Sequence, residues 1–133
     1  MTSIRDLLKY KGSTVWSVEP GTSVLEALKV LADKEIGALP VLQEGQLVGI
    51  ISERDFVRSI AQTGRCIVDA TVAEYMTREI VTIGLDQTTE QCMQMMTDHH
   101  IRHLPVIEKG KLERLENTRV LLAAARLETN EHS

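Results

Sequence analysis

Hydrophobic and polar positions follow the same order twice along the chain. The segment 36–41, IGALPV, returns 65 positions later as 101–106, IRHLPV. At the same spacing, the apolar segment 15–18, VWSV, matches the segment 80–83, IVTI. A fixed period indicates one structural unit that is folded twice. The pattern in each copy predicts a strand, a helix, two strands and a second helix.

The first helix of each copy is predicted from its N-terminal cap. Ser23 and Glu26 have the spacing of a capping box, in which the serine accepts a backbone N–H and the glutamate reaches back. Thr88 and Gln91 repeat this chemistry in the second copy. The apolar positions that follow have helical spacing and predict a buried face, formed by Val24, Ala27, Leu28, Leu31 and Ala32 in the first copy and by Cys92, Met93, Met95 and Met96 in the second.

A hairpin follows the first helix. The strands 38–42 and 46–51 are predicted on either side of a turn at Glu44-Gly45. The second of these runs is nearly all apolar, which is typical of a buried strand. A helix is predicted from Ser52 to about Ala61.

Composition narrows the class of protein. With 133 residues, of which 43% are hydrophobic, the chain predicts one compact domain or two half-domains that share a core. A net charge of −4 and an aromatic content of 3% disfavour a nucleic-acid binder. No apolar run approaches the ~20 residues of a membrane span. Since a secretory signal is also lacking at the N-terminus, we expect a cytoplasmic protein with Cys66 and Cys92 reduced.

Four segments carry a family resemblance: 36–41, then 45–55 (GQLVGIISERD), the lead-in 74–77 (EYMT), and 101–106. Their order resembles that of cystathionine-beta-synthase (CBS) domains, and the pair resembles a Bateman module of the stand-alone bacterial kind, over about residues 5 to 112. The resemblance implies an α/β fold of tandem CBS repeats, each β-α-β-β-α, packed around a pseudo-twofold axis. It also implies a homodimer formed through helical faces, for which the apolar segments 24–31 and 92–96 are candidates.

Domain boundaries follow from the repeat. We expect repeat 1 at residues 5–64 and a connector at 65–76 that ends in a short lead-in helix, 72–76, for the second copy. Repeat 2 is expected at 77–127, followed by a polar tail at 128–133.

The second repeat departs from the pattern after residue 112. Where repeat 1 has VGIISERD at 48–55, repeat 2 has ERLENTRV at 113–120. This change predicts that the buried strand is lost, with Val120 at the position of Asp55. We expect a helix over 120–127 instead.

The resemblance implies binding of an adenosine-containing ligand, such as AMP, ADP, ATP, NAD(H) or S-adenosylmethionine, in clefts between the repeats. Ser52 and Asp55 match the family's Ser/Thr-x-x-Asp motif, whose aspartate accepts hydrogen bonds from the ribose hydroxyls. A carboxylate can accept two hydroxyls, and a helix N-terminus favours its charge. The same spacing is also nearly a capping box, and the two interpretations are compatible.

By matching position, the adenine pocket implied by the resemblance is aliphatic. Small apolar groups suit a flat purine, while backbone groups recognise its edge. Ordinary strand core is the alternative explanation for several of these residues. The candidates are Ile36, Gly37, Ala38, Leu39 and Ile50, with Trp16 as a further possible contact.

Arg102 and His103 stand where repeat 1 has Gly37 and Ala38. In related modules a basic pair here reaches the phosphate held by the other repeat, and an arginine pairs well with phosphate oxygens. The alternative is a solvated pair beside Asp98 or Glu108. Because ribose and phosphate groups would come from different repeats, one competent cleft and one inactive cleft are predicted.

Catalysis and metal binding have little support in the sequence. His99, His100 and His103 match no standard zinc spacing. No nucleophile–base set is evident, so we expect neither an enzyme nor a resident cofactor. Two hypotheses remain. The first is a regulatory module that senses an adenosine nucleotide and acts on an unidentified partner protein. The second is a dimerising interaction module whose clefts are vestigial.

Overall fold

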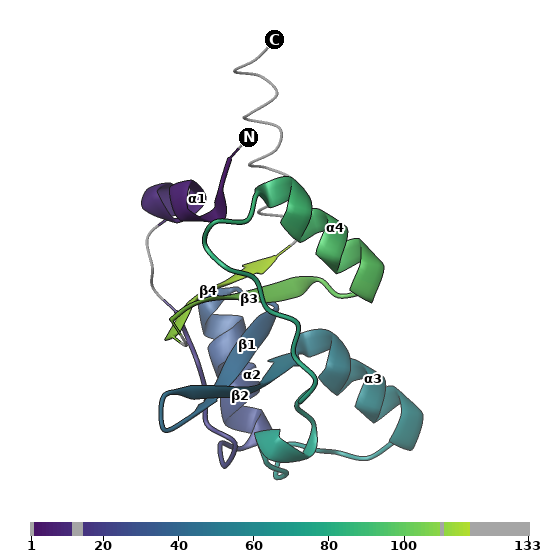
Figure 1. The fold of residues 1–133 in the computed structure, drawn as a ribbon. Helices are drawn as coiled ribbons and strands as arrows, with labels where there is room; N and C mark the ends of the chain where they lie inside the picture. The colour runs from purple at the N-terminus through teal and green to yellow at the C-terminus, as the bar shows by residue number, and fades with distance from the viewer. Residues whose placement is uncertain (1, 12–14, 110, 118–133) are drawn as a thin grey trace. The chain divides into compact units, whose positions relative to one another are not determined.

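The chain forms two compact units in the computed structural model, which describes residues 2–11, 15–109 and 111–117. Residues 16–80 make the first, here called the repeat-1 unit. Residues 81 onward, together with the N-terminal segment up to Val15, make the second, here called the repeat-2 unit. Each contains an antiparallel hairpin, as Figure 1 shows. Each also has its own hydrophobic core.

The repeat-1 unit contains the predicted hairpin, made by strands β1 (Ala38–Gln43) and β2 (Gln46–Ser52). Ala38 pairs with Ser52 at its open end, and a bulge follows Val41. Glu44 and Gly45 form the turn with φ values of 52° and 79°. Left-handed conformations at both positions match a two-residue turn whose twist suits the strands, so the predicted hairpin is confirmed.

The strand predicted before the first helix of each repeat is longer than the one observed, and this prediction is wrong in both units. In the part of the chain that the structure describes, only Val18 of the segment 15–18 makes a strand pair, parallel to Val41. Val18 donates to the Pro40 carbonyl at 3.2 Å and accepts from the Leu42 N–H at 2.8 Å. Pro40 has no N–H of its own to continue this ladder toward residue 16. Pro105 occupies the same place beside Ile83 in the repeat-2 unit, where Ile83 pairs with Val106.

Helix α2 (Val24–Lys34) packs on the hairpin and begins where the sequence predicts. Ser23 accepts the Glu26 N–H at 3.1 Å. The Glu26 side chain pairs with Lys29 at 3.6 Å rather than completing the capping box. The core takes most of the predicted face, since Val24, Ala27 and Leu31 are buried and Leu28 is partly buried, whereas Ala32 is exposed.

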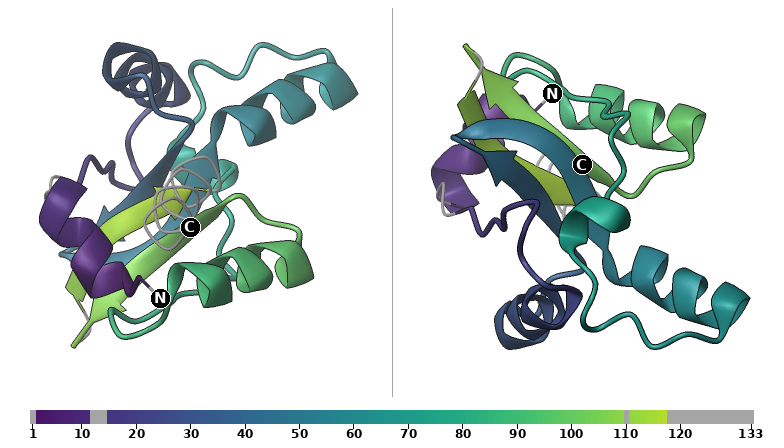
Figure 2. Two further views of the ribbon diagram at one scale, coloured as in Figure 1. Left: turned by 90° about the horizontal axis from the view of Figure 1, so that it is seen from above. Right: turned by 90° about the horizontal axis from the view of Figure 1, so that it is seen from below.

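Helix α3 (Glu53–Thr63) follows β2 directly and ends two residues beyond the predicted Ala61, with Gly64 as its C-cap. Phe56 is its buried anchor and meets Tyr75 edge to face, with ring centroids 6.3 Å apart. Both views in Figure 2 show α3 extending away from the end of the β1–β2 hairpin.

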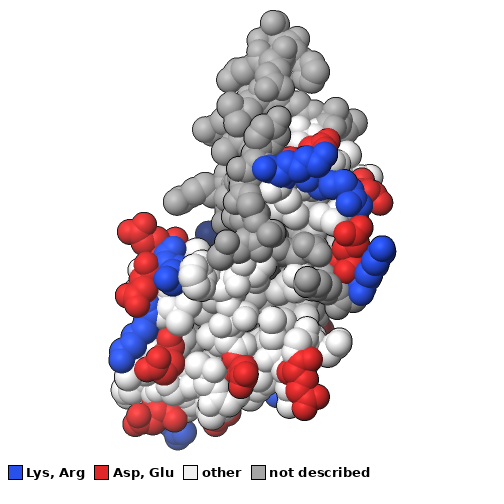
Figure 3. Space-filling view, turned by 90° about the vertical axis from the view of Figure 1, so that its left-hand side faces the viewer, with Lys and Arg blue, Asp and Glu red and all other residues white. Residues whose placement is uncertain are grey.

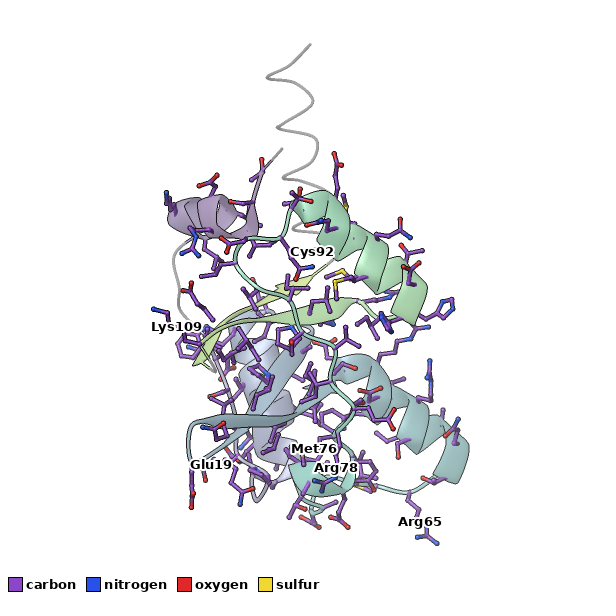
Figure 4. All side chains as sticks on the ribbon, in the orientation of Figure 1. Glu19, Arg65, Met76, Arg78, Cys92 and Lys109 are labelled. Atoms are coloured by element: carbon purple, nitrogen blue, oxygen red, sulfur yellow. The ribbon has the colours of Figure 1, made fainter. Side chains whose placement is uncertain are left out.

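The repeat-2 unit contains helix α4 (Thr89–His99) and strands β3 (His103–Glu108) and β4 (Lys111–Asn117). Thr88 and Gln91 form both halves of the predicted capping box. Cys92 is buried and points from α4 toward the hairpin, as Figure 4 shows.

The prediction that repeat 2 loses its last strand is wrong. Strand β4 pairs with β3 in the same register as the first hairpin, from His103 with Asn117 to Glu108 with Lys111, with a bulge after Val106. Leu112 and Leu115 keep the places of Leu47 and Ile50. Because backbone bonds and turn geometry define the pairing, polar substitutions elsewhere did not remove the strand. The helix expected over 120–127 and the tail at 128–133 lie outside the described residues.

Each unit is completed by the short helix that precedes the other repeat in sequence. Helix α1 (Ile4–Lys11) belongs to the repeat-2 unit, and the 3₁₀ helix η1 (Val72–Glu74) belongs to the repeat-1 unit. The compact units therefore divide differently from the predicted boundaries, and the 72–76 segment is a shorter helix that serves the first copy. Equivalent hydrogen bonds hold both segments: Ile4 N–H to Gln87 O, Arg5 N–H to Leu85 O, Val72 N–H to Thr22 O and Ala73 N–H to Pro20 O, all between 2.8 and 2.9 Å.

Arg5 adds a charged contact between α1 and its unit. Its guanidinium donates to Glu108 at 3.0 Å and to Asp86 at 3.2 Å. These hydrogen bonds, the one to Glu108 above all, raise the pKa of Arg5 above its usual value.

After η1 the chain adds a pairing residue to the outer edge of β2. Ile50 and Thr77 exchange both backbone hydrogen bonds, at 3.0 and 2.8 Å. Gly49 makes this approach possible, because a Cβ there would lie 2.6 Å from Sδ of Met76, which is labelled in Figure 4. Arg114 occupies the corresponding position of β4.

No helix among the described residues is long and apolar enough to span a membrane. On the face drawn in Figure 3, acidic and basic side chains are interspersed over the described part of the chain. This distribution does not suggest a surface for a highly charged polymer.

Candidate functional site

The N-terminus of α3 carries the predicted ribose motif. Ser52 Oγ accepts the Asp55 N–H at 3.2 Å, so Ser52 is the helix cap. This bond uses the backbone of Asp55, while its carboxylate is half-buried in the first turn of the helix and makes no hydrogen bond or ion pair with the other described residues. The capping interpretation of Ser52 is thus confirmed, and it is compatible with a binding role for Asp55.

The segment before β1 lies against the same helix end. The Gly37 carbonyl accepts the Glu53 N–H at 3.0 Å, which joins the start of β1 to the start of α3. Gly37 is exposed and Ile36 is partly buried. These two residues offer backbone and aliphatic surface next to the Asp55 carboxylate.

The other predicted adenine contacts are less accessible. Leu39 is fully buried in the core of the repeat-1 unit, and Ala38 is buried beside it. The side chain of Ile50 is partly buried, but its backbone N–H and carbonyl are both used by Thr77. Strand core therefore accounts for Leu39, whereas Ile36 and Gly37 are the better placed candidates.

Trp16 stands at the same end of the unit. The pairing of Val18 with Val41 places Trp16, two residues earlier, beside the start of β1. Its side chain is 44% exposed, and Lys34 Nζ lies 4.0 Å from the ring centroid. Sequence reasoning did not find Lys34, because no local pattern links the end of α2 with a residue 18 positions earlier.

The predicted phosphate contacts belong to the repeat-2 unit. Arg102 is exposed just before β3, and His103 is half-buried as its first residue. The acids offered as their alternative partners have other contacts, since Glu108 binds Arg5 and Asp98 accepts from Gln94 at 2.8 Å. Asn117 holds the position of Ser52 in this unit, and Val120 lies outside the described residues.

The three histidines considered for metal binding are separated by the end of α4. His99 is the last residue of the helix, and His100 caps it in a left-handed conformation with φ of 55°. Within the described residues, no group of three histidine, cysteine, aspartate or glutamate side chains is placed to hold a metal ion.

Comparison with known proteins identifies the family. The model of the CBS domain matches residues 10–62 and 72–113. The chain therefore belongs to the CBS domain family, and it contains the tandem pair that the repeat predicted.

Relatives and solved structures agree with this assignment. The CBS domain-containing protein CBSX3, mitochondrial, of Arabidopsis thaliana is 38% identical over 122 residues, covering 84% of this chain. The chain spans only 59% of that relative's length. The crystal structure of a CBS-domain containing protein from Agrobacterium tumefaciens matches with a TM-score of 0.89 at 35% identity, covering 93% of this chain and 99% of the other.

A further solved structure is the CBS domain pair of protein MJ0100 in complex with 5'-methylthioadenosine and S-adenosyl-L-methionine. It matches with a TM-score of 0.81 at 25% identity and covers 93% of this chain and 99% of its own.

Proposed function

We propose that this protein is a regulatory module that binds an adenosine nucleotide, of the AMP, ADP, ATP or NAD(H) kind, at the α3 end of the repeat-1 unit. The observation that carries the proposal is the half-buried Asp55 carboxylate at the start of α3. Ser52 caps the helix, so the carboxylate is left for two ligand hydroxyls, as a ribose offers.

Several neighbouring features support an adenosine ligand. Gly37 is exposed and its carbonyl is bonded to the first residue of α3, while Ile36 adds a partly buried aliphatic side chain just before it. The two ligands named for the MJ0100 domain pair both contain adenosine, which supports the same chemical class for this chain. Arg102 and His103 are proposed to bind the phosphate, because a guanidinium pairs bidentately with phosphate oxygens.

A regulatory role fits this site better than catalysis. The proposed ligand contacts are the Asp55 carboxylate, aliphatic and backbone groups, and the basic side chains of Arg102 and His103. The Ser52 hydroxyl caps α3 by accepting the Asp55 N–H, and we propose no nucleophilic role for it. A change in ligand occupancy would act on a partner protein in the cytoplasm, where we expect the protein to function.

The competing candidate is an interaction module that dimerises without a ligand. It draws support from α3, where the side chains of Val57 and Ile60 are exposed by 66% and 42%. In the helical faces first considered for dimerisation, Val24, Leu31 and Cys92 are buried, whereas Leu25 is 42% exposed. A dimer would therefore use α3 or the Leu25 side of α2, and light scattering of the wild type and a Val57→Lys variant would show whether α3 is needed.

A ligand panel with a matched pair of variants tests the proposed function. Isothermal calorimetry with AMP, ATP, NADH and S-adenosylmethionine should give saturable binding, and Asp55→Ala should weaken it by about 1.5–3 kcal/mol, the usual range for a hydrogen bond to a charged group. Glu53→Ala is the control, because it removes an exposed carboxylate from the same helix turn. Absence of binding by every ligand, or equal losses in the two variants, would contradict the proposal.

A further inference from the structure

Trp16 presents an aromatic face that is already occupied by a charge. It is the single tryptophan of the chain and is 44% exposed. Lys34, the last residue of α2, places its ammonium 4.0 Å from the centroid of the indole ring. This is the geometry of a cation–π contact, which is weak when it is exposed to solvent.

The pair lies at the end of the repeat-1 unit where we propose that the nucleotide binds. Trp16 precedes Val18, which pairs with Val41 of β1, and its ring contacts Lys34, four residues before β1 begins. Lys34 precedes Ile36 by two residues, and Gly37 is bonded to the N-terminus of α3 through Glu53. The indole, the Gly37 turn and the Ser52 cap thus come from elements that meet at one end of the hairpin.

We propose that the indole face beneath Lys34 is the stacking surface for the adenine base, and that Lys34 is an internal competitor which the base displaces. This inference rests on the proposed function, because it requires an adenosine ligand at this end of the unit. The other candidate contacts are aliphatic or backbone groups, so Trp16 is the residue there that offers a flat π surface.

Displacement of the Lys34 ammonium from the indole by the adenine base is favourable on physical grounds. A purine covers an indole face more fully than one ammonium group does, and base stacking on an aromatic side chain is generally stronger than an exposed cation–π contact. The displaced ammonium regains its water shell at the surface. Lys34 would therefore lower the affinity for the base without abolishing binding.

Substitutions at two positions, Trp16 and Lys34, separate the stacking surface from its competitor. Trp16→Leu should weaken adenosine about tenfold, within the range for loss of one stacked base, while Trp16→Phe should retain part of the affinity. Lys34→Met keeps an unbranched apolar side chain but removes the charge, and it should tighten adenosine by about two- to fivefold, the value of an exposed cation–π contact. Adenosine is the probe because it has no phosphate that Lys34 could attract. Lys29→Met is the matched control, since Lys29 lies on the same helix and pairs with Glu26.

Tryptophan fluorescence reports directly on base stacking, because Trp16 is the single tryptophan of the chain. Adenosine should change the emission of the wild-type protein, whereas ribose 5-phosphate, which lacks a base, should leave it unchanged. Circular dichroism and the unfolding midpoint show whether each variant is folded. If Trp16→Leu does not fold, Trp16→Phe and Lys34→Met decide the question.

Calorimetry with the wild type and Asp55→Ala distinguishes the possible failures. If none of adenosine, AMP, ATP, NADH and S-adenosylmethionine binds, the proposed function and this inference both fall. If adenosine binds in an Asp55-dependent manner but its affinity is the same in the Trp16 and Lys34 variants, only the stacking inference is overturned. Weaker adenosine binding in Lys34→Met would also overturn it, because Lys34 would then be a ligand contact.

Discussion

Thr89 places a hydroxyl inside the repeat-2 unit with no partner among the residues that the structure describes. The residue is 0% exposed, and within that part of the chain Oγ1 makes no hydrogen bond. Val24 stands at the same place in the first repeat and is also 0% exposed. The two residues have nearly the same shape, so the chain contains its own comparison between a methyl group and a hydroxyl group at the first position of a helix.

We expect Thr89→Val to stabilise the protein. A buried hydroxyl without a hydrogen bond destabilises the folded state by about 1–3 kcal/mol in protein mutational data. Valine fills the same volume and therefore leaves no cavity. The helix propensities of threonine and valine are close, and α4 keeps its cap because Thr88 is unchanged. A gain of about 1–2 kcal/mol in the free energy of unfolding should result.

Urea denaturation followed by far-UV circular dichroism measures this gain as a higher midpoint at unchanged slope. The reverse substitution, Val24→Thr, should lower the midpoint by a similar amount, because it introduces the same hydroxyl into the other core. A third variant, Thr89→Ala, removes the hydroxyl but also leaves a small void, so its gain should be smaller. If Thr89→Val is no more stable than the wild type, the hydroxyl has a partner in solution and the reasoning is refuted.

Two further predictions concern the ligand and the hairpin. Arg102→Ala should weaken AMP and ATP while leaving adenosine affinity unchanged in calorimetry, with one ligand bound per chain; two equivalent sites per chain would contradict the single competent site predicted from the sequence. Gly49→Ala should lower the free energy of unfolding by about 1–3 kcal/mol, because its Cβ would lie 2.6 Å from Met76 Sδ and 3.1 Å from the Thr77 carbonyl oxygen. Gly21→Ala is its control, since no atom lies within 4 Å of the added Cβ, and equal effects of the two would show that the close approach is unimportant.

Local features of the fold were predictable because their interactions span only a few residues. The Thr88 and Gln91 capping box closes within one helical turn, and the Glu44-Gly45 turn joins strands that are adjacent in sequence. The first strand was overpredicted because apolar character alone was considered. Pro40 was the available signal, since a residue without an N–H ends a parallel ladder.

Strand β4 was missed for the opposite reason. Its sequence has lost most of the apolar character of β2, yet Leu112 and Leu115 keep their places opposite β3. Backbone hydrogen bonds are available to every residue other than proline, so pairing persists where side-chain hydrophobicity is reduced.

The sequence by itself determined the repeat, the helix caps, the turn of the first hairpin, the CBS family and the candidate Ser52 and Asp55 pair. Each of these depends on neighbouring residues or on an order that recurs. The tertiary structure decided which lead-in completes which unit, since α1 bonds to Leu85 and Gln87 across a long stretch of chain. It also decided that Lys34 covers Trp16. Such contacts form only when the packing of helices and strands brings residues that are distant in sequence together. No local spacing of residues in the chain indicates which distant residues will meet.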